Sequence, residues 1–137
     1  MIIINNDISN FKLRGKMDYE RLEIIILKID LQEKPDLIPH LLVWTQDVNW
    51  PVAFPILEKL VAYPSEIIPH INQILNTNDG IWKDNVIRYL LKELPLEYKS
   101  TFKDELERIV KKPTRDEIED EVVEAAIEVL EEINKEQ

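Results

Sequence analysis

The chain has 137 residues, of which 45% are hydrophobic and 32% charged, a balance typical of a single soluble globular domain. The net charge of −10 is unevenly placed: residues 1–115 contain 17 acidic and 16 basic side chains, whereas residues 116–137 contain ten acidic side chains and one basic. Because phosphate binding needs clustered Lys and Arg, this charge argues against a nucleic-acid-binding protein. The lack of cysteine excludes disulfides, thiolate metal sites and a cysteine nucleophile.

The sequence also indicates where the protein resides. Residues 1–7 carry neither the basic lead nor the apolar run of a signal peptide, and no window approaches the roughly 18 apolar residues of a membrane helix. We therefore expect a cytoplasmic protein without membrane contact.

The N-terminal residues 1–17 read as an arm that precedes a single domain over residues 18–137. Ile2 to Ile4 are expected to cover an apolar edge. Asp18 is the expected N-cap of a helix that continues to Ile29, although the run EIIILKI within it is also typical of strands.

A segment then occurs twice. Residues 38–50 read IPHLLVWTQDVNW and residues 68–82 read IPHINQILNTNDGIW. Ile-Pro-His recurs at an offset of 30 and Asp-x-x-Trp at an offset of 32. The apolar spacing predicts, in each copy, a short helix, a turn that contains Asp and a longer helix.

The remaining helices follow from apolar spacing and from the prolines. Asp36, and Ser65 or Glu66, are the expected caps of the short helices. The last helix carries a narrow apolar stripe that includes Ile118 and Val122. The expected spans after the first helix are residues 36–46, 50–62, 65–75, 82–94, 96–112 and 114–133.

These elements predict an all-α fold of about seven helices, arranged as a short right-handed α-solenoid of HEAT-like helix pairs. The pairs are expected at residues 36–62, 65–94 and 96–135. A compact irregular helical bundle is the alternative.

Two motifs carry a resemblance to a known family. Asp79-x-x-Trp82-Lys83 is the second motif, and the first reads Leu42-x-Trp44-x-Gln46-Asp47-x-Asn49-Trp50-Pro51-Val52-Ala53. Together they resemble the signature of the bacterial domain-of-unknown-function family 5071, whose helical repeats are HEAT-like. The resemblance implies a small helical domain with no known activity. Asp84-Asn85 departs from the aromatic residue usual in that family after Trp-Lys.

Asp47 and Asp79 stand at equivalent turns of the two copies. The favoured interpretation is structural: each carboxylate caps the following helix and stabilises it by about 1 kcal/mol. The alternative is a pair of acids along one edge that form a hydrolytic site.

The three tryptophans, Trp44, Trp50 and Trp82, gather at the same two turns. Packing in the core or between repeats is the favoured interpretation. The alternative is a partner-binding surface, because aromatic rings surrounded by amides and a cation are typical of protein-binding hot spots. The surrounding residues would be Gln46, Asn49 and Lys83.

Neither histidine is expected to bind metal. His40 and His70 occupy equivalent positions, but neighbouring helices lie about 10 Å apart and no third ligand is evident. We predict no metal and no cofactor. The sequence also has no nucleophile–base pattern, no glycine-rich phosphate loop and no HExxH motif.

The acidic last helix is most simply a polar cap on the end of the array, and alternatively a surface for a basic partner. We therefore predict a non-enzymatic protein-binding module, monomeric or weakly dimeric, whose partner the sequence does not identify. An immunity-type protein that neutralises a bacterial toxin is one alternative. A HEAT-like nucleic-acid-binding protein is another, disfavoured by the acidity.

Overall fold

The computed structural model describes residues 9–136, which form helices, turns and bends and no strand. The all-α prediction is therefore confirmed. The α-helices are α1 (Tyr19–Lys28), α2 (Ile38–Leu42), α3 (Ala53–Val61), α4 (Pro64–Leu75), α5 (Gly80–Tyr89), α6 (Leu96–Lys99), α7 (Lys103–Lys111), α8 (Arg115–Glu119) and α9 (Val122–Glu136). Short 3₁₀ segments link them: η1 (Pro35–Leu37), η2 (Val43–Thr45), η3 (Leu91–Glu93) and η4 (Ser100–Phe102).

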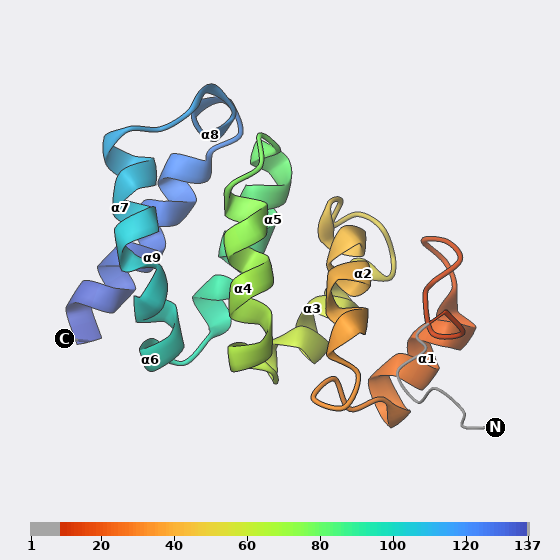
Figure 1. Cartoon of the computed structure of the whole chain (residues 1–137). Coiled ribbons are helices and arrows are strands. Elements are labelled where there is room, and N and C mark those ends of the chain that lie inside the picture. Colours follow the sequence, from red (N-terminus) through yellow and green to blue (C-terminus); the bar gives the residue numbers. More distant parts are fainter. Residues whose placement is uncertain (1–8, 137) are drawn as a thin grey trace.

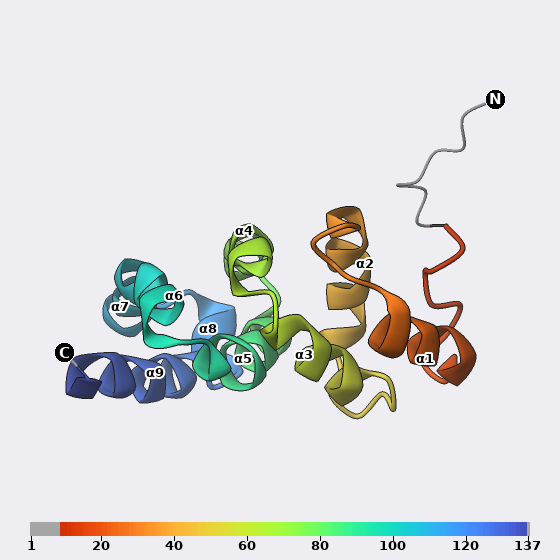
Figure 2. The same ribbon diagram turned by 90° about the horizontal axis from the view of Figure 1, so that it is seen from below.

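The helices lie in a row, with α1 at one end of the molecule and the end of α9 at the other (Figure 1). Seen from below, they form two layers, with α2, α4, α6 and α7 on one side and α1, α3, α5 and α9 on the other (Figure 2). Contacts of α2 with α3, of α4 with α5 and of α7 with α9 join the layers.

The two copies of the repeated segment lie side by side, because α2 contacts α4 in one layer and α3 follows α2 as α5 follows α4. Their first helices also end alike. The Thr45 hydroxyl donates to the carbonyl of Leu42 (2.6 Å), and the Thr77 hydroxyl donates to the carbonyl of Ile74 (2.7 Å). These threonines stand at the same offset as the repeated Asp-x-x-Trp.

Helix α1 forms where a helix is expected, so the strand alternative is wrong. Asp18 is its N-cap and accepts from the Arg21 backbone N–H (3.3 Å). Arg14 hydrogen-bonds the same carboxylate (2.9 Å), which holds the pKa of Asp18 well below its usual value. Before the helix, residues 9–17 form turns that bury Leu13. The expected cover by Ile2 to Ile4 lies outside the described residues.

Several boundaries differ from the predictions. The helix expected at 36–46 divides into η1, α2 and η2, and Asp36 lies inside η1, whose N-cap is Lys34. Helix α4 begins at Pro64 after Tyr63, so Ser65 and Glu66 lie within the first turn and do not cap it. Proline is favoured at the first helical position because its missing N–H needs no partner there.

The C-terminal region shows the largest difference. The helix expected at 96–112 divides into α6, η4 and α7, and the one expected at 114–133 breaks into α8 and α9. At the second break Glu121 has a φ of 63°, in the left-handed region. Ile118, expected inside, is 61% exposed. The other residues of the predicted stripe lie on α9, where Leu130 is half-buried and the remaining five are buried: Val122, Ala125, Ala126, Val129 and Ile133.

Candidate functional site

The start of α5 holds the second motif, and local chemistry fixes its first residues. The Asp79 carboxylate accepts from the Trp82 backbone N–H (3.0 Å), so the predicted cap is confirmed. Gly80, the first residue of the helix, packs directly on α8: a Cβ built there would collide with the Asp116 carbonyl and the Asp120 side chain. Glycine therefore allows α8 to approach α5.

Lys83 is buried, and its charge is neutralised inside the protein. Its Nζ lies 2.8 Å from Asp116 Oδ2 and 2.9 Å from Glu117 Oε2, both on α8. Arg108 of α7 forms a bidentate pair with Glu117 at 2.7 and 2.8 Å. The prediction that Lys83 belongs to a partner-binding surface is therefore wrong. Its ammonium group is buried in a polar network formed by α5, α7 and α8, so a partner cannot contact it.

Hydrogen bonds set the protonation of this cluster. Burial raises the pKa of Glu117, but hydrogen bonds from Arg108, the Thr114 backbone N–H and Lys83 outweigh burial and lower the pKa to about 2. Burial likewise opposes ionisation of Asp116, and hydrogen bonds from Lys83 and Thr114 nevertheless hold its pKa below the usual value. Both acids are thus ionised at neutral pH, as a structural ion-pair network requires.

On its other side, α5 binds the turn of the first copy. Trp82 Nε1 donates to Thr45 Oγ1 (2.9 Å), and the buried Asn85 donates through Nδ2 to the carbonyls of Thr45 (3.0 Å) and Gln46 (3.2 Å). Sequence reasoning missed the roles of Thr45 and Asn85. An asparagine among the apolar residues of α5 is the signal, since a buried amide needs partners.

The first copy's turn is built differently. The Asp47 carboxylate accepts from the Asn49 backbone N–H (2.8 Å), while the N-cap of α3 is Val52 with no side-chain hydrogen bond. The predicted capping role of Asp47 is therefore wrong: it closes a turn several residues before the helix. Asp47 and Asp79 thus hydrogen-bond to different backbone segments.

The tryptophans are all partly buried. Trp44 and Trp50 meet edge to face with ring centroids 5.6 Å apart, and Trp44 and Trp82 also pack against the core. Of the predicted surface residues around them, Asn49 is exposed and Gln46 is half-buried.

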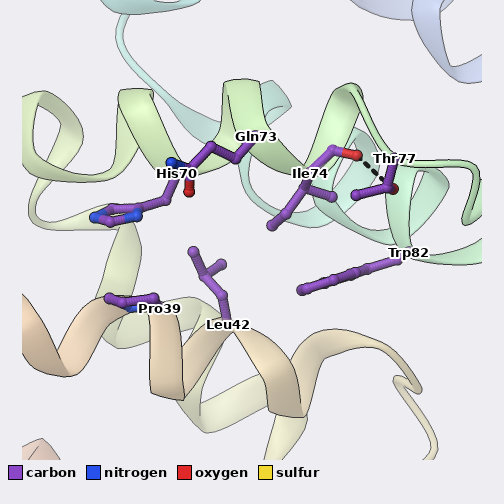
Figure 3. Close-up of a pocket in the computed structure, with 7 residues that line it drawn as sticks. All are labelled: Pro39, Leu42, His70, Gln73, Ile74, Thr77 and Trp82. Atoms are coloured by element: carbon purple, nitrogen blue, oxygen red, sulfur yellow. Dashed lines mark hydrogen bonds between the residues drawn. The ribbon is translucent and has the colours of Figure 1, made fainter.

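A pocket opens between α2 and α4, with Trp82 at one end and His70 with Pro39 at the other (Figure 3). Its volume is about 120 Å³. Its lining takes residues from both copies of the repeat: Pro39, Leu42, His70, Gln73, Ile74, Thr77 and Trp82. Sequence analysis singled out Trp82 and His70 separately and did not predict that they border one pocket.

Polar groups are few in this pocket. The Thr77 hydroxyl is already bonded to the Ile74 carbonyl. His70 Nδ1 is buried and has no hydrogen-bond partner among the described residues. His40, its counterpart in the first copy, does not line the pocket; burial, and then the charge of Lys12, lower its pKa. The pocket therefore has apolar walls, and its polar side chains are those of His70, Gln73 and Thr77.

Neither a metal site nor a membrane helix emerges from the described part of the chain. Within residues 9–136, no three His, Asp or Glu side chains come together as a metal would require, and no helix has the length and apolarity to cross a membrane.

Comparisons with known proteins place the chain in a family. A search of curated proteins found no match. The family model described as "Domain of unknown function (DUF5071)" matches residues 13–130, which include both motifs, the pocket and the Lys83 cluster. The match covers most of the 137 residues. This chain therefore belongs to the DUF5071 family.

Proposed function

We propose that this protein is a non-enzymatic helical-repeat module that binds a protein partner, and that the pocket between α2 and α4 receives one apolar side chain of that partner. The observation that carries the proposal is the lining of the pocket: apolar side chains from both repeat copies, Trp82 at one end, and the exposed Gln73 side chain at the rim. Interface pockets that anchor one side chain have this mixture of apolar wall and isolated polar group.

The size of the pocket supports this ligand class. An apolar protein cavity of about 150 Å³ accepts benzene. A pocket of about 120 Å³ therefore suits a single aliphatic side chain better than a cofactor.

The arrangement of the helices supports the repeat class. We infer that α2–α3 and α4–α5 are consecutive units of a right-handed HEAT-like solenoid, with α7 and α9 as a closing pair. The support is the shared Thr-to-carbonyl ending of α2 and α4 and the two-layer row (Figure 2). A solenoid presents a row of inter-helix grooves, which suits protein recognition.

The non-enzymatic part of the proposal has its own support. The two acids that a hydrolase would use, Asp47 and Asp79, are each hydrogen-bonded to backbone N–H groups of their own turns. Lys83, the nearby base, is paired with Asp116 and Glu117.

Neutralisation of a basic toxin is a more specific form of the proposal, and its support is the acidic surplus of residues 116–137. The same surplus disfavours nucleic acid. A cytoplasmic location and a monomeric or weakly dimeric state remain expectations from the sequence.

The test blocks the pocket from its rim. Gln73 is exposed on α4 and lines the pocket, so Gln73→Trp places an indole across the opening. Asn72→Trp is the matched control, because Asn72 is the exposed neighbour on the same helix and does not line the pocket. Tagged full-length protein is used to capture its partner from the source cells, and the captured band is quantified for each variant.

We expect Gln73→Trp to abolish capture and Asn72→Trp to retain it, with both variants folded by circular dichroism. Equal capture by both variants would remove the pocket from the binding surface. Absence of any captured protein with the unmodified chain, at native expression level, would count against the binding function itself.

A further inference from the structure

A second hollow lies in the opposite layer, between α3 and the end of α5. It has a volume of about 320 Å³ and is lined by Phe54, Leu57, Glu58, Val61, Tyr89 and Glu93. Phe54 and Tyr89 meet edge to face with centroids 5.1 Å apart, yet they remain 47% and 38% exposed. We call this hollow the Phe54–Tyr89 cleft.

Two carboxylates that form no ion pair with another described residue lie beside these rings. Glu58 and Glu93 are exposed, and neither has an ion-pair partner among residues 9–136. Their side chains line the same cleft as the two rings. The cleft therefore carries net negative charge beside aromatic surface.

The neighbouring cations are engaged elsewhere. Lys59 donates to the Ile26 carbonyl (3.2 Å) and lies over the Tyr63 ring. Lys92 pairs with Glu128 (3.4 Å), and Arg88 pairs with Asp84 (2.7 Å). These cations, each adjacent in the sequence to a residue that lines the cleft, thus have other partners within the protein.

We propose that the Phe54–Tyr89 cleft binds an arginine side chain of a protein partner. A guanidinium group stacks on aromatic faces and pairs with carboxylates in a planar fork, so rings and acids together match it better than they match an ammonium. The apolar walls from Leu57 and Val61 suit the methylene stem of the same side chain. This cleft shares no lining residue with the pocket between α2 and α4. The helices that line it, α3 and α5, lie in the other layer (Figure 2).

The probe is the peptide acetyl-Leu-Arg-Leu-amide, titrated into the ¹⁵N-labelled full chain at low salt. The matched probe replaces arginine by citrulline, which keeps the shape and removes the charge. We expect saturable amide shifts centred on Phe54, Glu58, Tyr89 and Glu93 with the arginine peptide. The citrulline peptide is expected to bind about tenfold more weakly, because it forms no ion pair.

Two variants test the carboxylates against net charge. Glu58→Gln with Glu93→Gln is expected to weaken the arginine peptide by about fivefold or more. Glu97→Gln with Glu131→Gln removes the same charge from exposed positions outside the cleft and is expected to leave binding unchanged. Tyr89→Leu is expected to weaken binding while the charge stays constant.

Equal responses to arginine and citrulline, or shifts centred outside the cleft, would overturn the proposal. So would equal weakening by the two double variants, since net charge alone would then explain it. Gln73→Trp is expected to leave this titration unchanged. A negative result in the peptide titration therefore does not bear on the pocket between α2 and α4. A negative result in the capture experiment likewise does not bear on the Phe54–Tyr89 cleft.

Discussion

At the residue scale, the first six positions of α5 and its cap contact several other elements through specific side chains. Asp79 caps the helix, Gly80 admits α8, Trp82 and Asn85 bind the first copy's turn, and Lys83 enters the acid cluster of α8. Each substitution there is expected to act through a different neighbour, so stability measurements can separate the contacts.

Gly80→Ala tests the close approach of α8. Alanine normally stabilises a helix relative to glycine, but here the added methyl collides with backbone, and we expect a net loss of about 1–3 kcal/mol. Gly15→Ala is the control, because nothing lies within 4 Å of its added Cβ. Its effect is expected to stay within about 1 kcal/mol, as urea unfolding of both variants will measure. Equal effects of the two changes would contradict the close packing.

Glu117 predicts a dependence of stability on pH. Its folded-state pKa of about 2 lies below the ordinary value of 4.5, so the unfolded chain takes up the proton first as the pH falls. The stabilisation is therefore complete above about pH 4.5 and is lost between there and pH 2. The difference between these two pKa values corresponds to roughly 3 kcal/mol.

The measurement is the free energy of unfolding from pH 7 to pH 2 for the wild type and Glu117→Gln. The variant is expected to be less stable at neutral pH and to lose less stability on acidification. Taking the difference between the two curves cancels the contribution of other acids such as Asp116. Parallel curves would show that Glu117 does not carry the pH dependence.

Local residue roles were predictable, and distant ones were not. Asp79 could be assigned because an N-cap and its recipient lie three residues apart. Lys83 could not, because its partner Glu117 is 34 residues away and only folding brings them together. Asp47 misled the prediction because a turn and a cap use the same side chain chemistry.

At the element scale, apolar spacing predicted that helices form, and tertiary contacts decided where they end. The stripe on α9 is buried as expected. The break between α8 and α9 contains no proline or glycine, so the local sequence does not predict it. It exists because α8 turns to place Asp116 and Glu117 against Lys83.

Glu121→Gly tests this break. A non-glycine residue in the left-handed region is strained, and glycine relieves that strain, so the variant is expected to gain roughly 0.5–1 kcal/mol. Glu131→Gly, at an exposed position inside α9, is expected to lose about 1 kcal/mol. Thermal unfolding of both variants gives the comparison, and a loss of stability in Glu121→Gly would contradict the left-handed turn.

At the scale of the whole molecule, the repeat correctly predicted that the two copies lie side by side. The order of the helices in the row leaves α1 at one edge, where it packs mainly on α3, whereas α5 contacts α4, α8 and α9. Stability is therefore expected to fall toward the N-terminal edge.

Hydrogen exchange measures that gradient. Ile25 of α1 and Val86 of α5 both have fully buried side chains, so burial alone does not separate them. We expect the Ile25 amide to exchange through a partial opening about 1–2 kcal/mol below the free energy that protects Val86. Leu22→Ala should lower the protection of Ile25 more than that of Val86. Equal protection at the two amides would mean that the row opens as one unit.

The offset of 32 that aligns Trp50 with Trp82 also aligns Pro51 with Lys83 and Ala53 with Asn85. The first copy therefore lacks the amide with which Asn85 binds the neighbouring turn and the ammonium with which Lys83 pairs with α8. We therefore expect that the two copies cannot replace one another, because the first has no counterpart of the Asn85 amide or the Lys83 ammonium.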